Sequence, residues 1–303
     1  MSSAVVMAYG DIGSRCIKTL IEYNIKIKFV VTKEEPSYAG WFNNIVDESS
    51  LYNISVCNYA PHKNESLIEK IATISPDYLF IINFPEVLPT ELFSMVRISS
   101  YHLHFSLLPY YKGHHPIQWS IINGEKQTGV TLSLTTGKIN EFSIINQIPI
   151  PILSHDTSSD IEKKLTVSGE IILFQTMPHI LKNSVVSHPI TKDYGSHFRP
   201  LGTKDRQFHW HWDALRIHNL IRAFSPPHEG AFFDLENKLF WVQQSRLTNQ
   251  HGKPGNYIYT DNRLIIFAGD GRGIEIISLA CEEGTLPIEE WVCAHPNQCL
   301  FKS

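Results

Sequence analysis

The sequence predicts an α/β fold for residues 1–198 and a smaller β-rich domain for residues 199–303, on three observations. Short apolar runs alternate with segments of helical spacing over roughly the first 100 residues. A polar stretch with Pro and Gly interrupts this pattern between residues 187 and 205. Beyond it, short runs of β-forming residues follow one another, separated by Gly, Asn and Asp. Two domains joined by a linker are therefore expected.

Strands and helices alternate in the first half. Because a strand followed by a helix and a second strand forms a right-handed βαβ unit, this order predicts a parallel, Rossmann-like sheet. The turn GDIG at residues 10–13 is only a fragment of the dinucleotide fingerprint, and close packing of the turn explains its glycines better than a cofactor does. The predicted strands cover residues 4–9, 25–32, 54–58 and 77–84, and the predicted helices follow the GDIG turn and cover residues 65–74 and 90–96.

Three further strands and a helix complete the first domain. The strands are expected at residues 101–106, 128–136 and 142–152. Thr157 and Ser158 can cap a helix whose apolar face continues to Leu181. After the linker, the segment 213–224 has helical spacing, and the β-rich runs that follow predict a small antiparallel barrel (OB-like).

Composition limits the classes of partner. With 303 residues, 43% of them apolar, the chain is long enough to bury a sizeable core. The net charge of −4 offers no general attraction to nucleic acid or anionic lipid. The five cysteines form no CxxC pair, and residues 1–10 lack the regions of a secretory signal. We expect a cytoplasmic protein with free thiols that binds neither nucleic acid nor a membrane, and a homodimer is one option for its oligomeric state.

Four histidines fall within the stretch 101–119, which reads YHLHFSLLPYYKGHHPIQW. His102 and His104 are two residues apart on a predicted strand, so both rings leave the strand on one face. The residues SLLP follow, where the strand leaves the sheet. In an open parallel sheet, ligands bind at the carboxyl ends of the strands, and this position favours a functional role for both residues.

These residues carry a family resemblance. The block HLHFSLLPYYKGHHPIQWSIINGEKQTGVTL resembles the signature of the 10-formyltetrahydrofolate-dependent formyltransferases, in which N-x-H-x-S-L-L-P precedes a Tyr-Arg-Gly-type loop, a Pro-Ile/Leu-x-W helix and a T-G-V-T strand. AYGDIG near the start and WDALRIHNLIRAFSPPHEGAFF, KPGNYIY and GDGRGIEI further on resemble other parts of the same family. The likeness is strongest to sugar N-formyltransferases and to the domains that formylate UDP-4-amino-4-deoxy-L-arabinose.

The resemblance implies an enzyme that transfers a formyl group from 10-formyltetrahydrofolate, as co-substrate, to the amine of a nucleotide-linked sugar or similar small metabolite. Transfer-RNA formyltransferases share the two-domain layout. However, residues 196–303 carry 11 Lys and Arg against 12 Asp and Glu, and such a region lacks the positive charge that binds a tRNA backbone. The implied catalytic positions are His102, His104 and Asn140. The implied folate-binding positions are Phe84, Pro85, Glu86, Val87, Leu88 and Gly137, and the implied acceptor-binding positions are Ser106, Tyr111, Lys112, Gly113, His114 and His115.

Two catalytic positions depart from the family pattern. Members of the family use Asn, His and Asp, and the Asn and His stabilise the oxyanion while the Asp orients the His and assists proton removal. His104 occupies the His position, but His102 stands in place of Asn and Asn140 in place of Asp. An imidazole still donates one hydrogen bond. An amide cannot carry the charge that stabilises an imidazolium, and Glu141 is adjacent to Asn140 but would usually point elsewhere.

Alternatives to an active formyltransferase therefore stay open. One is a catalytically silent homologue that binds folate or a substrate, and another is a different acyl transfer on the same scaffold. A third is a metal-assisted reaction at His102, His104 and His114 or His115, although no acidic ligand lies beside the strand and we assign no metal. The motif HWHW at residues 209–212 is typical of packing, and Arg222, on one helix face with His218 and Asn219, could reach a phosphate or cap a carbonyl.

Overall fold

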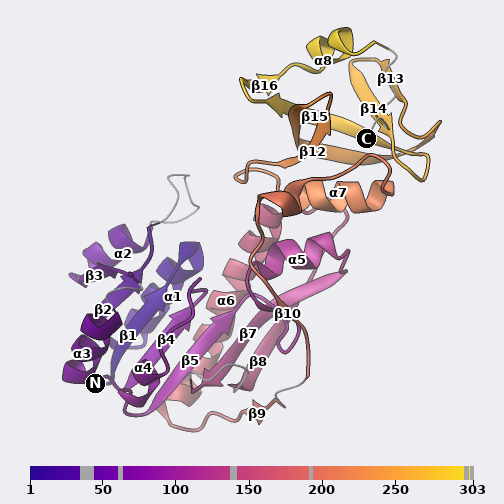
Figure 1. The fold of residues 1–303 in the computed structure, drawn as a ribbon. Coiled ribbons are helices and arrows are strands. Elements are labelled where there is room, and N and C mark those ends of the chain that lie inside the picture. The colour runs from indigo at the N-terminus through magenta and orange to yellow at the C-terminus, as the bar shows by residue number, and fades with distance from the viewer. Residues whose placement is uncertain (35–43, 61–63, 137–141, 191–193, 297–299, 301–303) are drawn as a thin grey trace. The chain divides into compact units, whose positions relative to one another are not determined.

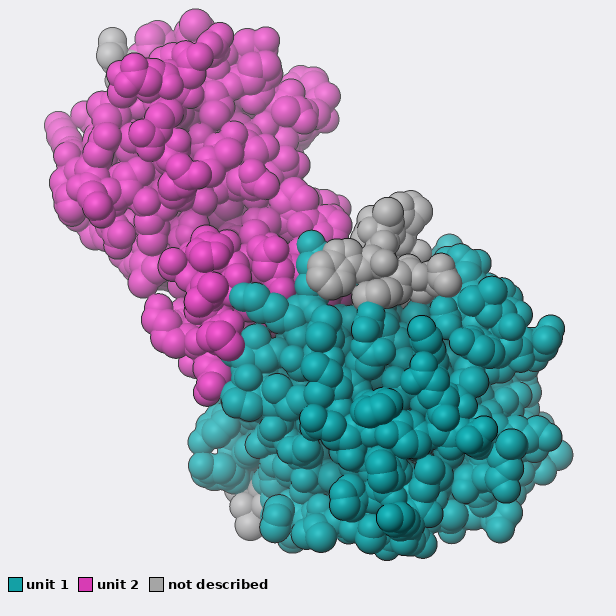
Figure 2. All heavy atoms as spheres, turned by 180° about the vertical axis from the view of Figure 1, so that it is seen from behind, with its two compact units in different colours: residues 1–112, 128–150, 163–197 teal, residues 113–127, 151–162, 198–303 magenta. Residues whose placement is uncertain are grey.

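The computed structural model describes residues 1–34, 44–60, 64–136, 142–190, 194–296 and 300. Contacts divide the chain into two compact units (Figure 2). Unit 1 contains Met1–Lys112, Thr128–Ile150 and Lys163–His197, and unit 2 contains Gly113–Gln127, Pro151–Glu162 and Phe198–Ser303. The division after His197 follows the sequence, whereas two earlier segments join unit 2. The predicted pair of sequence-continuous domains, 1–198 and 199–303, stays a prediction.

An eight-stranded sheet forms the centre of unit 1 (Figure 1), with strand order β3-β2-β1-β4-β5-β7-β8-β9. The pairs β2–β3, β1–β2, β1–β4 and β4–β5 are parallel, as the alternation of strands and helices predicts. Beyond β5 the direction changes, because β5–β7 and β8–β9 pair antiparallel. The strands are β1 (Ser3–Ala8), β2 (Lys26–Thr32), β3 (Val56–Asn58), β4 (Tyr78–Ile82), β5 (Ser99–His104), β7 (Gln127–Thr135), β8 (Phe142–Pro151) and β9 (His188–Pro189).

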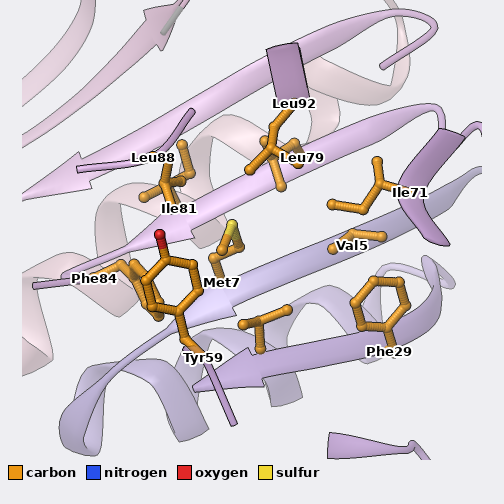
Figure 3. Packing of buried hydrophobic residues seen from close by; sticks show 11 residues of the cluster. Val5, Met7, Phe29, Tyr59, Ile71, Leu79, Ile81, Phe84, Leu88 and Leu92 are labelled. Carbon is orange, nitrogen blue, oxygen red and sulfur yellow. The ribbon is translucent and has the colours of Figure 1, made fainter. Parts of the chain in front are cut away.

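One face of this sheet packs against short helices. Val5, Leu79 and Ile81 on adjacent strands meet Ile71 of α3 and Leu92 of α4 in a cluster of buried apolar residues (Figure 3). β1 and β4 are apolar at nearly every position, as expected for strands buried on both faces. The helices of the first part of the chain are α1 (Gly10–Glu22), α2 (Ile45–Leu51), α3 (Asn64–Ile74), α4 (Glu91–Ser94) and α6 (Ser158–Leu181).

Two glycines permit close helix packing elsewhere in unit 1. A Cβ on Gly13 would lie 2.7 Å from Cδ1 of Ile45, and one on Gly169 would lie 2.8 Å from Cδ1 of Ile12. Both distances are shorter than a carbon–carbon contact allows. Close packing is therefore the role of Gly13 in the GDIG turn, as the sequence favours.

Unit 2 is built on an antiparallel six-stranded sheet. Its main path runs β11-β12-β15-β14-β13, and β16 pairs with β15. The antiparallel sheet that the sequence predicts for this region is present, and its strands follow an open path from β11 to β13 among the described residues. The strands are β11 (Ala231–Leu235), β12 (Lys238–His251), β13 (Tyr257–Thr260), β14 (Arg263–Phe267), β15 (Arg272–Cys281) and β16 (Gly284–Leu286), and the helices are α5 (Pro116–Ile122), α7 (Ala214–Ala223) and α8 (Ile288–Ala294). A short pair, β6 (Lys112–Gly113) and β10 (His197–Phe198), and the 3₁₀ helix Thr203–Arg206 complete the described elements.

The elements that the residue pattern did not predict are short and weakly amphipathic. Helix α2 buries only Ile45 and Ser49 and begins at a cap in which Asn44 accepts a hydrogen bond from the amide of Asp47 at 2.8 Å. Helix α8 buries only Trp291. Strand β5 begins and ends two residues earlier than predicted, so that His104 is its last residue. In the described part of the chain, no helix is long and apolar enough to cross a bilayer.

Candidate functional site

Three chain segments meet at the carboxyl edge of the parallel strands in unit 1. They follow β1, β4 and β5 and begin at Tyr9, Asn83 and Phe105. The amide of Tyr9 donates to the carbonyl oxygen of Ile82 at 3.1 Å, and the amide of Asn83 donates to that of Leu103 at 3.1 Å. These bonds continue the parallel ladder past the ends of the strands. The edge is where ligands bind in open α/β sheets.

Backbone conformation at this edge explains two residue types. Gly10 has φ +73°, and Asn83 has φ 49°. Both values lie in the left-handed region, which glycine adopts freely and asparagine tolerates better than most residues. A Cβ on Gly10 would stand 4.0 Å from Nδ2 of Asn83, so the two turns lie side by side.

His102 and His104 leave β5 on the same face, with ring centroids 5.4 Å apart. In the parallel register His102 lies opposite Ile81, a member of the buried cluster described above. Phe84 and Leu88, which bound the predicted folate loop, belong to the same cluster. The histidines and this loop therefore lie on one face of the sheet, as a shared site requires.

His104 is held in one tautomer. Its Nε2 atom lies 3.1 Å from the carbonyl oxygen of Tyr111. Because a carbonyl oxygen only accepts hydrogen bonds, Nε2 carries the proton and Nδ1 of the neutral ring keeps its lone pair. Burial lowers the pKa of His104, and the bond to Tyr111 partly offsets this effect. The neutral ring can thus act as a base through Nδ1.

His102 is a half-buried imidazole without such a hydrogen bond in the described part of the chain. Burial, with the neighbouring His104 as a smaller cause, lowers its pKa to about 3. Its main-chain carbonyl oxygen accepts a bond from the Ser133 hydroxyl at 3.3 Å. Among the described residues, no side chain or backbone group bonds to the ring of His102. The neutral ring keeps one N–H donor available for a ligand.

Two residues that the sequence did not single out fix the loop after β5. The hydroxyl of Thr131, opposite His104 in the register, donates to the carbonyl oxygen of Ser106 at 2.6 Å and accepts from the amide of Leu108 at 3.0 Å. The amide group of Gln147 donates to Thr131 Oγ1 and to the Leu108 carbonyl oxygen, both at 2.8 Å. A β-strand threonine gives no distinctive sequence signal for such a role.

The predicted folate loop, residues 84–88, is anchored at its ends and open in its middle. Phe84 and Leu88 are each 8% exposed, whereas Val87 is 70% exposed. The carboxylate of Glu86 forms an ion pair with Lys33. Within the described part of the chain, no backbone hydrogen bond involves Pro85, Glu86 or Val87, so their three C=O groups and the N–H groups of Glu86 and Val87 are open to a ligand.

The predicted acceptor residues fall in both units. In unit 1, the Ser106 hydroxyl donates to the carbonyl oxygen of Tyr110 at 2.8 Å. The main-chain amide of Tyr111 donates to the Ser196 hydroxyl at 2.9 Å. The ammonium group of Lys112 donates to the carbonyl oxygen of Tyr194 at 3.1 Å. Gly113, His114 and His115 belong to unit 2, where the rings of the two histidines are 6.4 Å apart.

Two predicted site residues, Gly137 and Asn140, lie outside the described residues, as does Glu141. Of the residues that the structure does describe, no carboxylate hydrogen-bonds to His104. The same part of the chain contains no group of three His, Cys, Asp or Glu side chains arranged to hold a metal ion.

The remaining clusters are structural. In unit 2, the guanidinium of Arg222 donates to the carbonyl oxygens of Leu153 and Asp156 at 3.3 and 2.8 Å, so it caps carbonyls. His218 bonds to Ser245 and to the Ser154 carbonyl. In the HWHW motif, Trp210 is 3% exposed and packs edge-on against Phe208 and Phe233.

Comparison with known proteins agrees with this geometry. The family model described as formyl transferase matches residues 4–177, and the model of the formyl transferase C-terminal domain matches residues 200–296. The bifunctional polymyxin resistance protein ArnA of Wigglesworthia glossinidia brevipalpis is 34% identical over 276 residues, which are 90% of this chain and 42% of that protein. The chain thus spans less than half the length of that relative.

Two further relatives match over their whole length or nearly so. Methionyl-tRNA formyltransferase of Lactobacillus johnsonii is 30% identical over 288 residues, which are 92% of this chain and 90% of that protein. Among solved structures, the N-formyltransferase of Helicobacter canadensis, in complex with folinic acid and dTDP-3-aminofucose, is 19% identical with a TM-score of 0.71 and covers 94% of this chain and 100% of that one. The structural match establishes the shared fold.

Proposed function

The chain belongs to the formyl transferase family, and on that premise we propose that it transfers a formyl group from 10-formyltetrahydrofolate to the amine of a nucleotide-linked amino sugar or a similar small metabolite. The observation that carries the proposal is the state of His104. Its ring stands at the carboxyl end of β5 with Nε2–H bonded to the Tyr111 carbonyl oxygen, which leaves Nδ1 as a base.

The proposed chemistry uses both histidines. The amine nitrogen attacks the formyl carbon, a new C–N bond forms, and the bond from that carbon to N10 of the folate breaks. His104 Nδ1 takes the proton that the amine loses and returns a proton to N10, so the ring ends unchanged. The N–H of His102 donates to the carbonyl oxygen while that oxygen carries negative charge. A low pKa keeps His102 neutral, so it acts as a hydrogen-bond donor without a charge.

The loop after β4 supports the folate assignment. The open backbone groups of Pro85, Glu86 and Val87 suit the edge of a pterin, which both donates and accepts hydrogen bonds, and the exposed side chain of Val87 offers an apolar contact. Phe84 and Leu88 anchor this loop, and Gly137 would complete the site. The co-substrate is thus proposed to lie beside His102 and His104.

The acceptor is the finer part of the proposal. Similarity to ArnA and to an N-formyltransferase in complex with dTDP-3-aminofucose favours a nucleotide-linked amino sugar, bound through Ser106, Tyr111, Lys112, Gly113, His114 and His115. Similarity to methionyl-tRNA formyltransferase favours a tRNA. The balance of −1 over residues 196–303 argues for the small acceptor, because a tRNA-binding surface is normally basic.

A second candidate function rests on the two altered positions. His102 replaces the amide that the family uses, and no carboxylate bonds to His104 among the residues that the structure describes. These observations favour a homologue that binds folate or a substrate without turnover, or that performs another acyl transfer.

One experiment separates the two functions. The chain is incubated with 10-formyltetrahydrofolate and a panel of UDP- and dTDP-linked amino sugars, with initiator tRNA as a further acceptor, and formylated product is measured by mass spectrometry. An enzyme gives turnover that His104→Ala lowers by about 10²- to 10⁴-fold. Turnover that appears only in the variant His102→Asn/Asn140→Asp would show that the natural chain has lost the reaction.

A further inference from the structure

Unit 2 contains a cavity of about 460 Å³. Three segments far apart in the sequence line it. They are the start of α5 with His115 and Gln118, the stretch from Leu201 to Arg206, and the turn after α7 from Phe224 to Glu229. All of these residues belong to unit 2, and the volume lies within the range of about 300 to 1,000 Å³ that is usual for small-molecule sites.

The cavity presents hydrogen-bond donors from two neutral imidazoles. Nδ1 of His115 accepts from the amide of Leu201 at 3.0 Å, so the neutral ring carries its proton on Nε2. Nε2 of His228 lies 3.1 Å from the amide nitrogen of Gln118, so this ring carries its proton on Nδ1. Burial lowers the pKa of both rings, with His114 acting further on His115, and with His115 and Arg206 acting further on His228.

The cavity also contains a positive charge whose partner faces solvent. Nη1 of Arg206 lies 2.5 Å from Oε2 of Glu229. The side chain of Arg206 is 16% exposed, whereas that of Glu229 is 77% exposed. A solvated carboxylate moves away from an ion pair at little cost, whereas the largely buried guanidinium stays. Glu229 therefore occupies a position that another anion can take.

An apolar surface lies beside this charge. Phe224 is 7% exposed and forms part of the lining together with Pro227. A ligand that fits must combine an anionic group, which Arg206 and the imidazole N–H donors can bind, with a flat or apolar part that covers Phe224 and Pro227. A nucleoside phosphate has both features, and a free inorganic anion has only one.

We propose that this cavity is a binding site for a nucleoside phosphate, whose phosphate displaces Glu229 from Arg206. The inference deepens the proposed function and in part rests on it, because His115 also belongs to the proposed acceptor residues, and it adds Arg206 and its neighbours in unit 2 to them. The nucleoside phosphate can be the nucleotide part of the acceptor or a separate nucleotide, and both sources present the same chemistry to the cavity.

Binding of UDP and of dTDP to the full chain, measured by isothermal titration calorimetry, tests the proposal without any turnover. Arg206→Gln should weaken binding by at least about tenfold, because it removes a charge-assisted hydrogen bond. Glu229→Gln should tighten binding by about two- to fivefold, because it removes the competing carboxylate. Arg246→Gln, which changes an arginine on β12 that pairs with Glu275 outside the cavity, is the matched control and should leave binding unchanged.

If the ion pair were purely structural, Arg206→Gln and Glu229→Gln would change the affinity for UDP in the same direction. That result would contradict the proposal. Gly202→Val gives an independent variant, since Gly202 has an extended backbone and the nearest atom to a new Cβ is 3.9 Å away. It should fold normally and exclude UDP from the cavity. Equal UDP binding by wild type, Arg206→Gln and Gly202→Val, or no binding by wild type, would overturn the proposal.

Kinetics distinguish the two sources of the nucleotide. If the cavity holds the acceptor's own nucleotide, Arg206→Gln raises the KM for the acceptor with kcat retained, and UDP competes with the acceptor. If a separate nucleotide binds, Arg206→Gln loses UDP binding while the KM for the acceptor stays as in wild type. Because UDP binding needs no turnover, a failure of the proposed formyl transfer leaves this test intact.

Discussion

His102 in unit 1 and His218 in unit 2 both have low pKa values, but they differ in exposure and in hydrogen bonding. His218 is 6% exposed, whereas His102 is half-buried. Burial lowers the pKa of His102 to about 3 and that of His218 to about 4. Both ring nitrogens of His218 have partners, the Ser245 hydroxyl at 2.9 Å and the Ser154 carbonyl oxygen at 3.2 Å. The ring of His102 has no partner among the described residues.

The difference is the one expected between a structural histidine, His218, and the functional role proposed for His102. Burying a polar group costs free energy unless it is hydrogen-bonded, so a native fold normally satisfies such groups internally. His218 follows this rule and joins α7 to the segment before α6. The ring of the half-buried His102 has no such internal hydrogen bond among the described residues, and under the proposed function the formyl oxygen accepts its N–H.

The largest effect should follow from removing His102. We expect His102→Ala to lower kcat for formyl transfer by about 10²- to 10³-fold, as for other oxyanion donors. The free energy of unfolding should change by less than about 1 kcal/mol, because the ring gives up no internal hydrogen bond. Turnover assays and urea unfolding measure the two quantities. If His102→Ala lost much stability but kept its kcat, His102 would be the structural histidine, contrary to the comparison. His188→Ala, at an exposed position on β9, is the control.

His218→Ala should give the opposite pattern. The substitution leaves the Ser154 carbonyl oxygen and the Ser245 hydroxyl without their partner and opens a cavity beside α7. We expect the free energy of unfolding to fall by about 2 to 3 kcal/mol, with kcat nearly unchanged. Urea unfolding followed by tryptophan fluorescence measures the free energy of unfolding. The matched control is His209→Ala, because His209 is exposed. Unchanged stability would show that these hydrogen bonds contribute nothing.

Acidification should give the smallest of these effects, a gradual fall in the free energy of unfolding with each pH unit. Both histidines have folded-state pKa values below the usual 6.5, so between about pH 6.5 and 4.5 the unfolded chain binds more protons than the folded chain. Stability is therefore fully present above about pH 6.5 and falls with pH below it, by up to about 1.4 kcal/mol per pH unit for each histidine.

Urea unfolding at several pH values in this window measures the slope. His102→Asn and His218→Asn should each make this slope shallower. A slope that neither variant changes would mean that other groups cause the acid sensitivity. Carboxyl groups with lowered pKa values, such as Asp77 and Glu275, contribute at lower pH.

The sequence predicted the layout of unit 1 because its central strands are continuous apolar runs, and it located His102 and His104 because a spacing of two places both on one face. It did not predict Thr131 or Gln147, whose roles depend on an antiparallel neighbour that no local pattern reveals. The cavity of unit 2 was beyond prediction for a related reason, since its lining comes from segments near residues 115, 203 and 228 that only the folded chain brings together.

The bond between His104 and Tyr111 has an evolutionary consequence. Its acceptor is a main-chain carbonyl oxygen, which every amino acid possesses. A substitution at position 111 that preserves the turn would therefore keep the proton on Nε2 of His104. The side chain at this position is free to diversify while the protonation of its neighbour is inherited unchanged. Under the proposed function, acceptor preference would then change in evolution without altering the base.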